Sequence, residues 1–147
     1  MPARLRDGQV WARGGSNENA IGNLALHLCG NVRQWIVSGV VVRPDIRDRD
    51  AEFAARGGPG ARDLAARVHA AVEEAAQVLE SIKPERLGQR VAIQKYEVTV
   101  LEAIYHVVEH FSMHTGQILF ATKAITGGDL EFYRHLRSQA LHGQTMP

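Results

Sequence analysis

Residues 105–117 read YHVVEHFSMHTGQ, a segment of helical character in which three histidines lie four residues apart. On an α-helix this spacing places His106, His110 and His114 in one stripe, about one turn apart. The stripe also carries three apolar residues: Val107, Phe111 and Ile118. It is therefore expected to face the protein interior, where an imidazole needs a partner and a metal ion is one way to supply it. We predict that His110 and His114 chelate one metal ion from successive turns of this helix.

A second amphipathic helix is predicted from Asn19 to Ser38. Residues of its inner face recur at steps of three and four: Leu24, His27, Leu28, Asn31 and Trp35. In an up-and-down bundle, facing helices bring such residues together in the core, so His27 can join the two other histidines. Three neutral imidazoles leave one coordination position open, which is typical of catalytic zinc sites. The alternative is that these histidines are exposed or hydrogen-bonded without a metal, because short motifs give many false positives.

A third long helix is predicted from about Ala61 to Ile82, after a polar loop over residues 43–60. Its inner face is expected to consist of five residues: Leu64, Val68, Val72, Ala75 and Leu79. Within the preceding loop, residues 47–53 could form a helical turn.

A capping box at Thr99-Val100-Leu101-Glu102 predicts where the helix with the three histidines begins. That helix should run to about Ile125 and end at Thr126-Gly127-Gly128. A short helix from Asp129 to about Ser138 is expected to follow, docked by four residues: Leu130, Phe132, Tyr133 and Leu136. Strand signals are too weak to predict a sheet, although residues 91–95 could be extended. The predicted class is all-α, a helical bundle in a single domain over residues 1–147.

Composition excludes several classes of function. The 147 residues are 45% hydrophobic and 22% charged, and the formal net charge is +1, so no long-range field attracts nucleic acid or an anionic membrane. Cys29 is the only cysteine and cannot form an internal disulfide. The first eleven residues lack the apolar stretch of a signal peptide, and no segment is apolar over the ~18–20 residues of a membrane span. A soluble cytoplasmic protein without nucleic-acid or membrane partners is therefore expected.

Three segments together carry a resemblance to a known family. They are NAIGNLALHLCGNVRQW at residues 19–35, RDRDAEF at residues 47–53 and EHFSMHTGQI at residues 109–118. The combination resembles the DinB-like superfamily, in the subgroup of unknown function that has an HLxGNxRxW segment, over residues 5–136. The resemblance implies a four-helix bundle with a metal bound by three histidines, which here are His27, His110 and His114. Characterised relatives use zinc or another divalent metal to activate a low-molecular-weight thiol.

The chain departs from the resemblance at its beginning. DinB-like domains start with a full helix before the segment that matches Asn19, whereas only about eighteen residues precede it here, and residues 1–15 contain one proline and three glycines. The first helix is thus expected to be truncated. Three helices alone would leave an apolar stripe exposed, so we predict a homodimer in which a second copy covers it.

Several polar residues near the predicted ligands have two interpretations. His106 could be a fourth ligand or a hydrogen-bonded histidine of the core. Gln117 could hold a water or a carbonyl group, or fill a polar gap, and Arg33 could likewise hold a substrate. Asn31 could bond the His27 ring and fix its tautomer, or bond a backbone group. The acidic residues of the loop, Asp48, Asp50 and Glu52, could orient a ligand or bind a substrate amine. Alternatively, they cap a helix and pair with Arg47 and Arg49.

Two classes of function follow from these residues. The first is a divalent-metal-dependent enzyme, in particular a thiol-dependent S-transferase that acts on a small molecule. The second is a non-catalytic metal-binding or stress-associated scaffold in which the metal stabilises the bundle. Three imidazoles suit zinc best, and also nickel, iron or copper. An open cavity beside the metal would favour the enzyme, whereas a closed four-ligand site would favour the scaffold.

Overall fold

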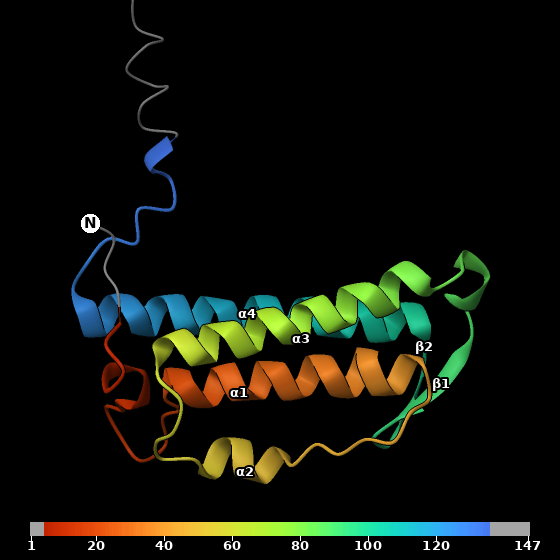
Figure 1. Ribbon diagram of the computed structural model, residues 1–147, viewed down its shortest axis with the longest axis horizontal. Coiled ribbons are helices and arrows are strands. Elements are labelled where there is room, and N and C mark those ends of the chain that lie inside the picture. Colours follow the sequence, from red (N-terminus) through yellow and green to blue (C-terminus); the bar gives the residue numbers. More distant parts are fainter. Residues whose placement is uncertain (1–4, 136–147) are drawn as a thin grey trace, which may run out of the picture.

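Three long helices lie side by side and form the body of the protein (Figure 1). The computed structural model describes residues 5–135, in which the long helices are α1 (Ile21–Val32), α3 (Ala61–Ser81) and α4 (Val100–Thr126). The short helix α2 (Arg49–Ala54) packs against α1 from the loop predicted to contain a helical turn. Because α1 contacts α2, α3 and α4, it is the central element of the fold. The predicted all-α class is confirmed at this level: the structure is mostly helical.

The first long helix changes from an α-helix to a π-helix about two thirds of the way along its predicted length. Helix α1 continues directly into η2 (Arg33–Val40), a π-helix that buries Gln34, Trp35 and Ile36. The two segments together span the helix predicted from Asn19 to Ser38, and its predicted inner face is buried. A π-helix has a wider turn than an α-helix and often accompanies a functional site. Because the π-helix has more residues per turn, Gln34 and Trp35 point in directions that differ from those in a regular α-helix.

A β-hairpin lies where no sheet was predicted. Strand β1 (Arg90–Ile93) pairs antiparallel with β2 (Tyr96–Thr99), and Ile93 stands opposite Tyr96. The expectation that residues 91–95 could be extended is confirmed over 91–93, but the absence of a sheet was wrong. Strands of four residues are too short to show a clear period of two in the sequence. Val91 and Ile93 are nevertheless buried while their neighbours are exposed, which ties one face of the hairpin to the helices.

Helix α3 has the predicted length but a rotated inner face. Leu64 and Ala75 are buried, and Val68 is half-buried, as expected. Val72 and Leu79 were also assigned to this face, yet they are 39% and 37% exposed. Ala71 and Val78 take the inner positions instead. The predicted stripe is rotated by about 40° from the stripe that faces α1 and η2, because each residue advances about 100° round the helix and spacings of three and four fit both stripes.

The capping signals of α4 are confirmed. The Thr99 hydroxyl accepts from the Glu102 amide at 3.1 Å, and the Glu102 carboxylate accepts from the Thr99 amide at 2.6 Å. The helix ends before Gly127, whose φ of 64° only glycine adopts without strain. The short helix predicted from Asp129 to about Ser138 does not begin at Asp129: residues 129–133 are not helical, residues 134 and 135 are helical, and residues 136–138 lie outside the described residues. Phe132 and Tyr133, predicted to dock it, are exposed.

The segment before α1 forms no long helix in residues 5–20, as expected. It contains only the 3-10 turn η1 (Gln9–Trp11). The Trp11 ring packs on Gly22, where any side chain would collide with it, and the Trp11 indole donates to the Pro59 carbonyl at 3.0 Å. In this way the segment closes one end of the helices. Within residues 5–135, no helix combines the length and the apolar character that a membrane span requires.

Candidate metal centre

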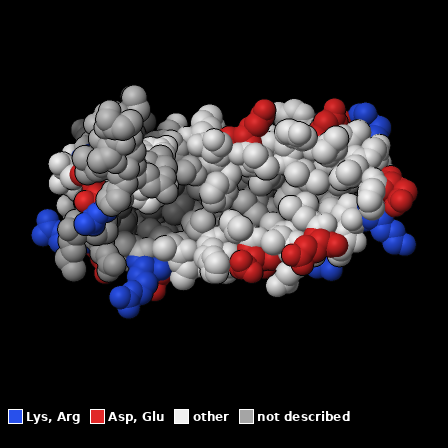
Figure 2. All heavy atoms as spheres, turned by 90° about the horizontal axis from the view of Figure 1, so that it is seen from above, with Lys and Arg blue, Asp and Glu red and all other residues white. Residues whose placement is uncertain are grey.

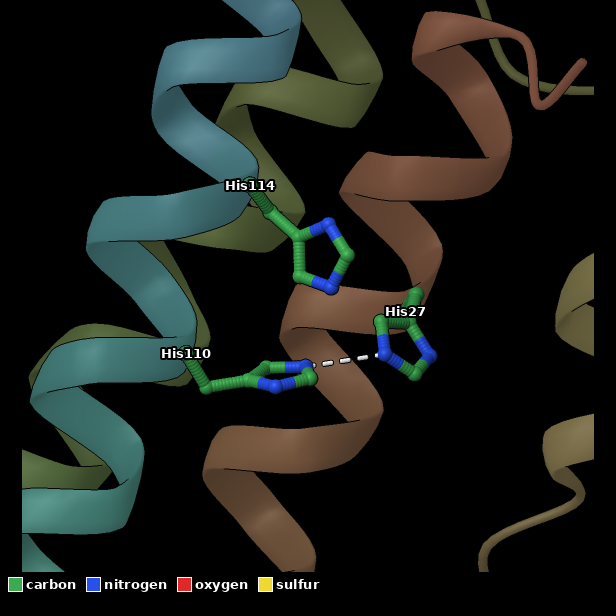
Figure 3. A group of neighbouring side chains, drawn as sticks. All are labelled: His27, His110 and His114. Atoms are coloured by element: carbon green, nitrogen blue, oxygen red, sulfur yellow. Dashed lines mark hydrogen bonds between the residues drawn. The ribbon is translucent and has the colours of Figure 1, made fainter.

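Three histidine side chains converge between α1 and α4 (Figure 3). His27 projects from α1, and His110 and His114 project from successive turns of α4; one ring nitrogen from each lies within 4.8 Å of the other two. The Nε2 atoms of His27 and His110 are 2.8 Å apart. His27 and His114 are buried, with 4% and 9% of their surface exposed. The structure therefore brings together the three residues that the sequence predicted as metal ligands.

The Nε2 atoms of His27 and His110 are slightly closer together than two nitrogens bound to one metal ion. Two nitrogens bound tetrahedrally to zinc at about 2.0–2.1 Å lie about 3.4 Å apart. The Nε2 atoms of His27 and His110 are closer than this because one of them must donate a proton to the other without a metal. Moving them apart by roughly half an ångström, which side-chain rotation provides, opens the position for the ion.

Two hydrogen bonds aim the ligand atoms at this position. Nδ1 of His27 lies 3.0 Å from Oε2 of Glu52, and Nδ1 of His114 lies 2.7 Å from Oε1 of Gln117. The Gln117 amide oxygen can only accept, so Nδ1 of His114 carries the proton. Nδ1 of His27 lies between an acceptor, the Glu52 carboxylate, and a donor, Nη2 of Arg47 at 2.9 Å, and it carries the proton when it bonds Glu52. Each Nε2 atom then keeps its lone pair for a metal. Such partners fix the tautomer of a ligand histidine and increase its basicity.

Glu52 reaches His27 because an arginine and a glycine make room for it. The Arg47 guanidinium donates to both oxygens of Glu52, from Nε at 2.7 Å and from Nη2 at 2.8 Å. This pair rests on α1 at Gly30, where a Cβ atom would overlap the Glu52 carboxylate. Glu52 thus bonds one of the three converging histidines and also pairs with Arg47. Asp48, by contrast, caps α2 by accepting from the Ala51 amide.

The remaining predicted residues have other positions. Asn31 does not bond His27; its Nδ2 atom lies 3.4 Å from Nε2 of His106. His106 stacks on Trp35, with ring centroids 3.9 Å apart, and is not one of the converging histidines. Arg33 points away from the site, since its guanidinium forms a bidentate ion pair with Glu74 on α3. Asn31 and His106 therefore line the surroundings of the site, whereas Arg33 does not take part in it.

A cavity of about 410 Å³ opens beside the converging histidines. His27 and His110 line one side of it, and Trp35, Tyr96 and His106 line another. The volume is within the range of about 300–1,000 Å³ that small-molecule sites have. A metal held by the three histidines would therefore be reachable by a ligand.

The electrostatics favour neutral imidazoles beside an ionised carboxylate. Burial lowers the pKa of His110 to about 4, and the neighbouring histidines act in the same direction. Burial also lowers the pKa of His114, although the bond to Gln117 opposes this. Burial raises the pKa of Glu52, but hydrogen bonds from Arg47 and His27 outweigh it, so its pKa lies below the usual value. These are the protonation states that metal binding requires.

A comparison with protein families assigns the chain. The model of the family described as "Protein of unknown function (DUF1572)" matches residues 2–137. Since the match spans most of the sequence, the chain belongs to this family. Searches of curated proteins and of solved structures found no match. The family description names no reaction, so the chemistry has to be argued from the site.

In metal-free protein, the free energy of unfolding should fall as the pH drops from about 6.5 to about 4. The pKa of His110 is about 4 when folded and 6.5 as a free side chain, so the unfolded state takes up the proton first. Urea denaturation with a chelator at pH values of about 7 and 4.5 measures this loss. It should be smaller in His110→Leu than in the wild type. His69→Leu, which changes an exposed histidine of α3, is the control; equal losses in all three proteins would contradict the prediction.

Proposed function

We propose that the protein is a divalent-metal-dependent enzyme related to the DinB-like superfamily, and that it activates a low-molecular-weight thiol for transfer to a small electrophile. The observation that carries the proposal is the set of three Nε2 atoms beside a cavity. Within residues 5–135, the converging group contains three histidines and no fourth ligating side chain. Three protein ligands with an open position are typical of catalytic rather than structural zinc sites.

The residues of the chain have separate roles in this proposal. His27, His110 and His114 would bind the ion, for which zinc suits the three imidazoles best, with nickel, iron and copper as alternatives. Glu52 and Gln117 would accept from the two Nδ1 atoms and so leave the Nε2 lone pairs of His27 and His114 free for the ion. A bound dication supplies Lewis acidity, which deprotonates a coordinating thiol at neutral pH. The cavity beside His27 and His110 would receive the electrophile.

Metal content is the first test. Protein purified without a His-tag or a chelating column should contain close to one equivalent of a divalent metal by elemental analysis. His110→Ala should retain a small fraction of an equivalent, because two imidazoles leave the ion weakly held. His69→Ala should retain the wild-type amount. Unchanged stoichiometry in His110→Ala would rule out this ligand assignment.

The role of Glu52 has a graded test. Glu52→Gln keeps the size of the side chain but removes the charge that pairs with Arg47 and orients His27. Loss of such a partner weakens metal binding by about 10- to 100-fold. Asp50→Asn is the matched control, since Asp50 is an exposed acidic residue on the same helix. Competition with a chromophoric chelator gives both affinities, and equal values would remove Glu52 from the site.

Thiol consumption tests the reaction. Glutathione, bacillithiol, mycothiol and cysteine are each incubated with generic electrophiles, with and without metal. At least one thiol should react faster with the metal-loaded protein than with the metal-free protein. His114→Ala should reduce the rate to the metal-free background while circular dichroism shows an intact helical content. If every thiol reacts at the background rate, the transferase proposal fails and the non-catalytic scaffold gains support.

We also propose that the protein forms a homodimer through α3 and α4. A groove of about 390 Å³ runs between these helices, and its lining is almost entirely apolar. Val72, Leu79 and Val108 along it are 39%, 37% and 60% exposed. Figure 2 views this side of the molecule from above and shows charged residues around the margins of an uncharged middle. A second copy supplies the same apolar stripe, and a two-fold interface requires such a self-complementary surface.

Sedimentation velocity at micromolar concentration tests this assembly. The wild-type protein should sediment as a dimer. Val108→Glu should shift it to the monomer, because a carboxylate buried in an apolar interface has no partner. Ile46→Glu is the control, since Ile46 is 95% exposed in the loop before α2. A wild-type monomer would contradict the proposal.

A further inference from the structure

The cavity beside the histidines has a floor and one wall made of flat rings. Trp35 and His106 stack with their centroids 3.9 Å apart and form the floor. The Tyr96 ring stands 6.3 Å from Trp35, tilted by 32°. Two rings that hold a flat group between them are separated by about 7 Å, twice the ordinary contact distance. At 6.3 Å, Trp35 and Tyr96 have the spacing of a direct aromatic pair, so a third flat group enters between them only when Tyr96 moves outward.

Two buried polar atoms at this cavity have no hydrogen-bond partner. They are the donor Nε1 of Trp35 and the acceptor Oδ1 of Asn31, in residues that are 4% and 3% exposed. Both residues line the cavity and lie one helical turn apart. A buried donor or acceptor without a partner is costly, and such groups are rare in folded proteins. A ligand that offers one acceptor and one donor would satisfy both atoms.

The charges around the cavity balance. Arg47 is neutralised by Glu52, and the other charged side chains of the lining are Arg49 and Glu102. The lining thus carries no excess of one sign that would select an ion. The ligand that fits these features is flat, neutral and able both to donate and to accept a hydrogen bond.

We propose that this cavity binds the neutral, flat amide or heteroaromatic group of the substrate, stacked between Trp35 and Tyr96 and hydrogen-bonded to Asn31 and the Trp35 indole. The reacting end of the substrate then points to His27 and His110, and this last step alone rests on the proposed function. A puckered aliphatic ring that carries the same amide could pair the two polar atoms but could not stack on Trp35 and Tyr96.

Binding requires a small movement of Tyr96. The unpaired atoms are closed off from solvent, so a ligand reaches them only when a covering ring shifts. Tyr96 is 59% exposed at the start of β2, directly after the turn of the hairpin, and can move without disturbing the core. The Tyr96 side chain becomes more buried when the ligand is present.

Fluorescence of Trp35 in metal-free protein tests the proposal. Trp11→Phe removes the second indole, so the signal reports on Trp35 alone. Benzamide, which is flat, neutral and carries an amide, should change the emission in a saturable way. Cyclohexanecarboxamide has the same amide on a puckered ring and should bind at least about fivefold more weakly, as should benzoate, since stacking and hydrogen bonding each account for part of the affinity. If Trp11→Phe does not fold, saturation-transfer NMR on the wild-type protein gives the same ranking.

A pair of tyrosine variants locates the binding. Tyr96→Ala should weaken benzamide binding by about tenfold, because base-like flat groups lose roughly this much when a stacking ring is removed. Tyr105→Ala is the control, since Tyr105 is equally exposed, at 60%, on α4 outside the cavity. Equal affinity in the two variants, or equal affinity for benzamide and cyclohexanecarboxamide, would overturn the proposal. The benzamide titration uses metal-free protein, so it is independent of the metal-content and thiol measurements. A negative result in either set of experiments therefore does not change the other.

Discussion

The bond between Glu52 and His27 is the contact on which the arrangement of the site depends. It connects α2 to α1, and it determines which nitrogen of His27 faces the other histidines. A buried carboxylate is unfavourable unless it is paired, and Arg47 provides the pairing from within the same loop. Gly30 is the position at which this pair approaches the helix backbone. The short helix α2 therefore supports one of the three converging histidines and is more than a connection between long helices.

Most of the helical framework could be predicted from local signals. These signals are local in the sequence, and the structure agrees with each of them: the capping box at Thr99, the glycine after Thr126 and the apolar period of α1. The convergence of His27 with His110 and His114 was also predictable, because the inner faces of neighbouring helices in a bundle project into the same core. The exposed positions Val72 and Leu79 were assigned to the core wrongly, since the period of a helix does not state which stripe its neighbours will cover.

The rest depended on tertiary contacts that have no local signature. Glu52 lies twenty-five residues from His27, and nothing in the acidic loop distinguishes it from Asp48 or Asp50. Gly30 was the available clue, because a glycine inside a helix is unfavourable unless a neighbour needs the space. The hairpin over residues 90–99 has strands too short for periodicity to detect. The residues of the HLxGNxRxW segment likewise have different roles. His27 is one of the converging histidines, Gly30 allows the close approach of Glu52, and Trp35 lines the cavity. Arg33 forms an ion pair with α3.

The buried amide of Gln34 adds a polar connection between the hairpin and the residues around His27. Its Oε1 atom accepts from Gln94 at the tip of the hairpin and, at 2.8 Å, from Arg47, which holds Glu52 and so His27. A shift of the hairpin and a reorientation of His27 consequently share one polar network. If the proposed ion and the proposed cavity ligand both bind, thermodynamic reciprocity applies: each changes the affinity for the other by the same factor. The π-helix buries Gln34 at the position where its side chain contacts both Gln94 of the hairpin and Arg47 beside His27.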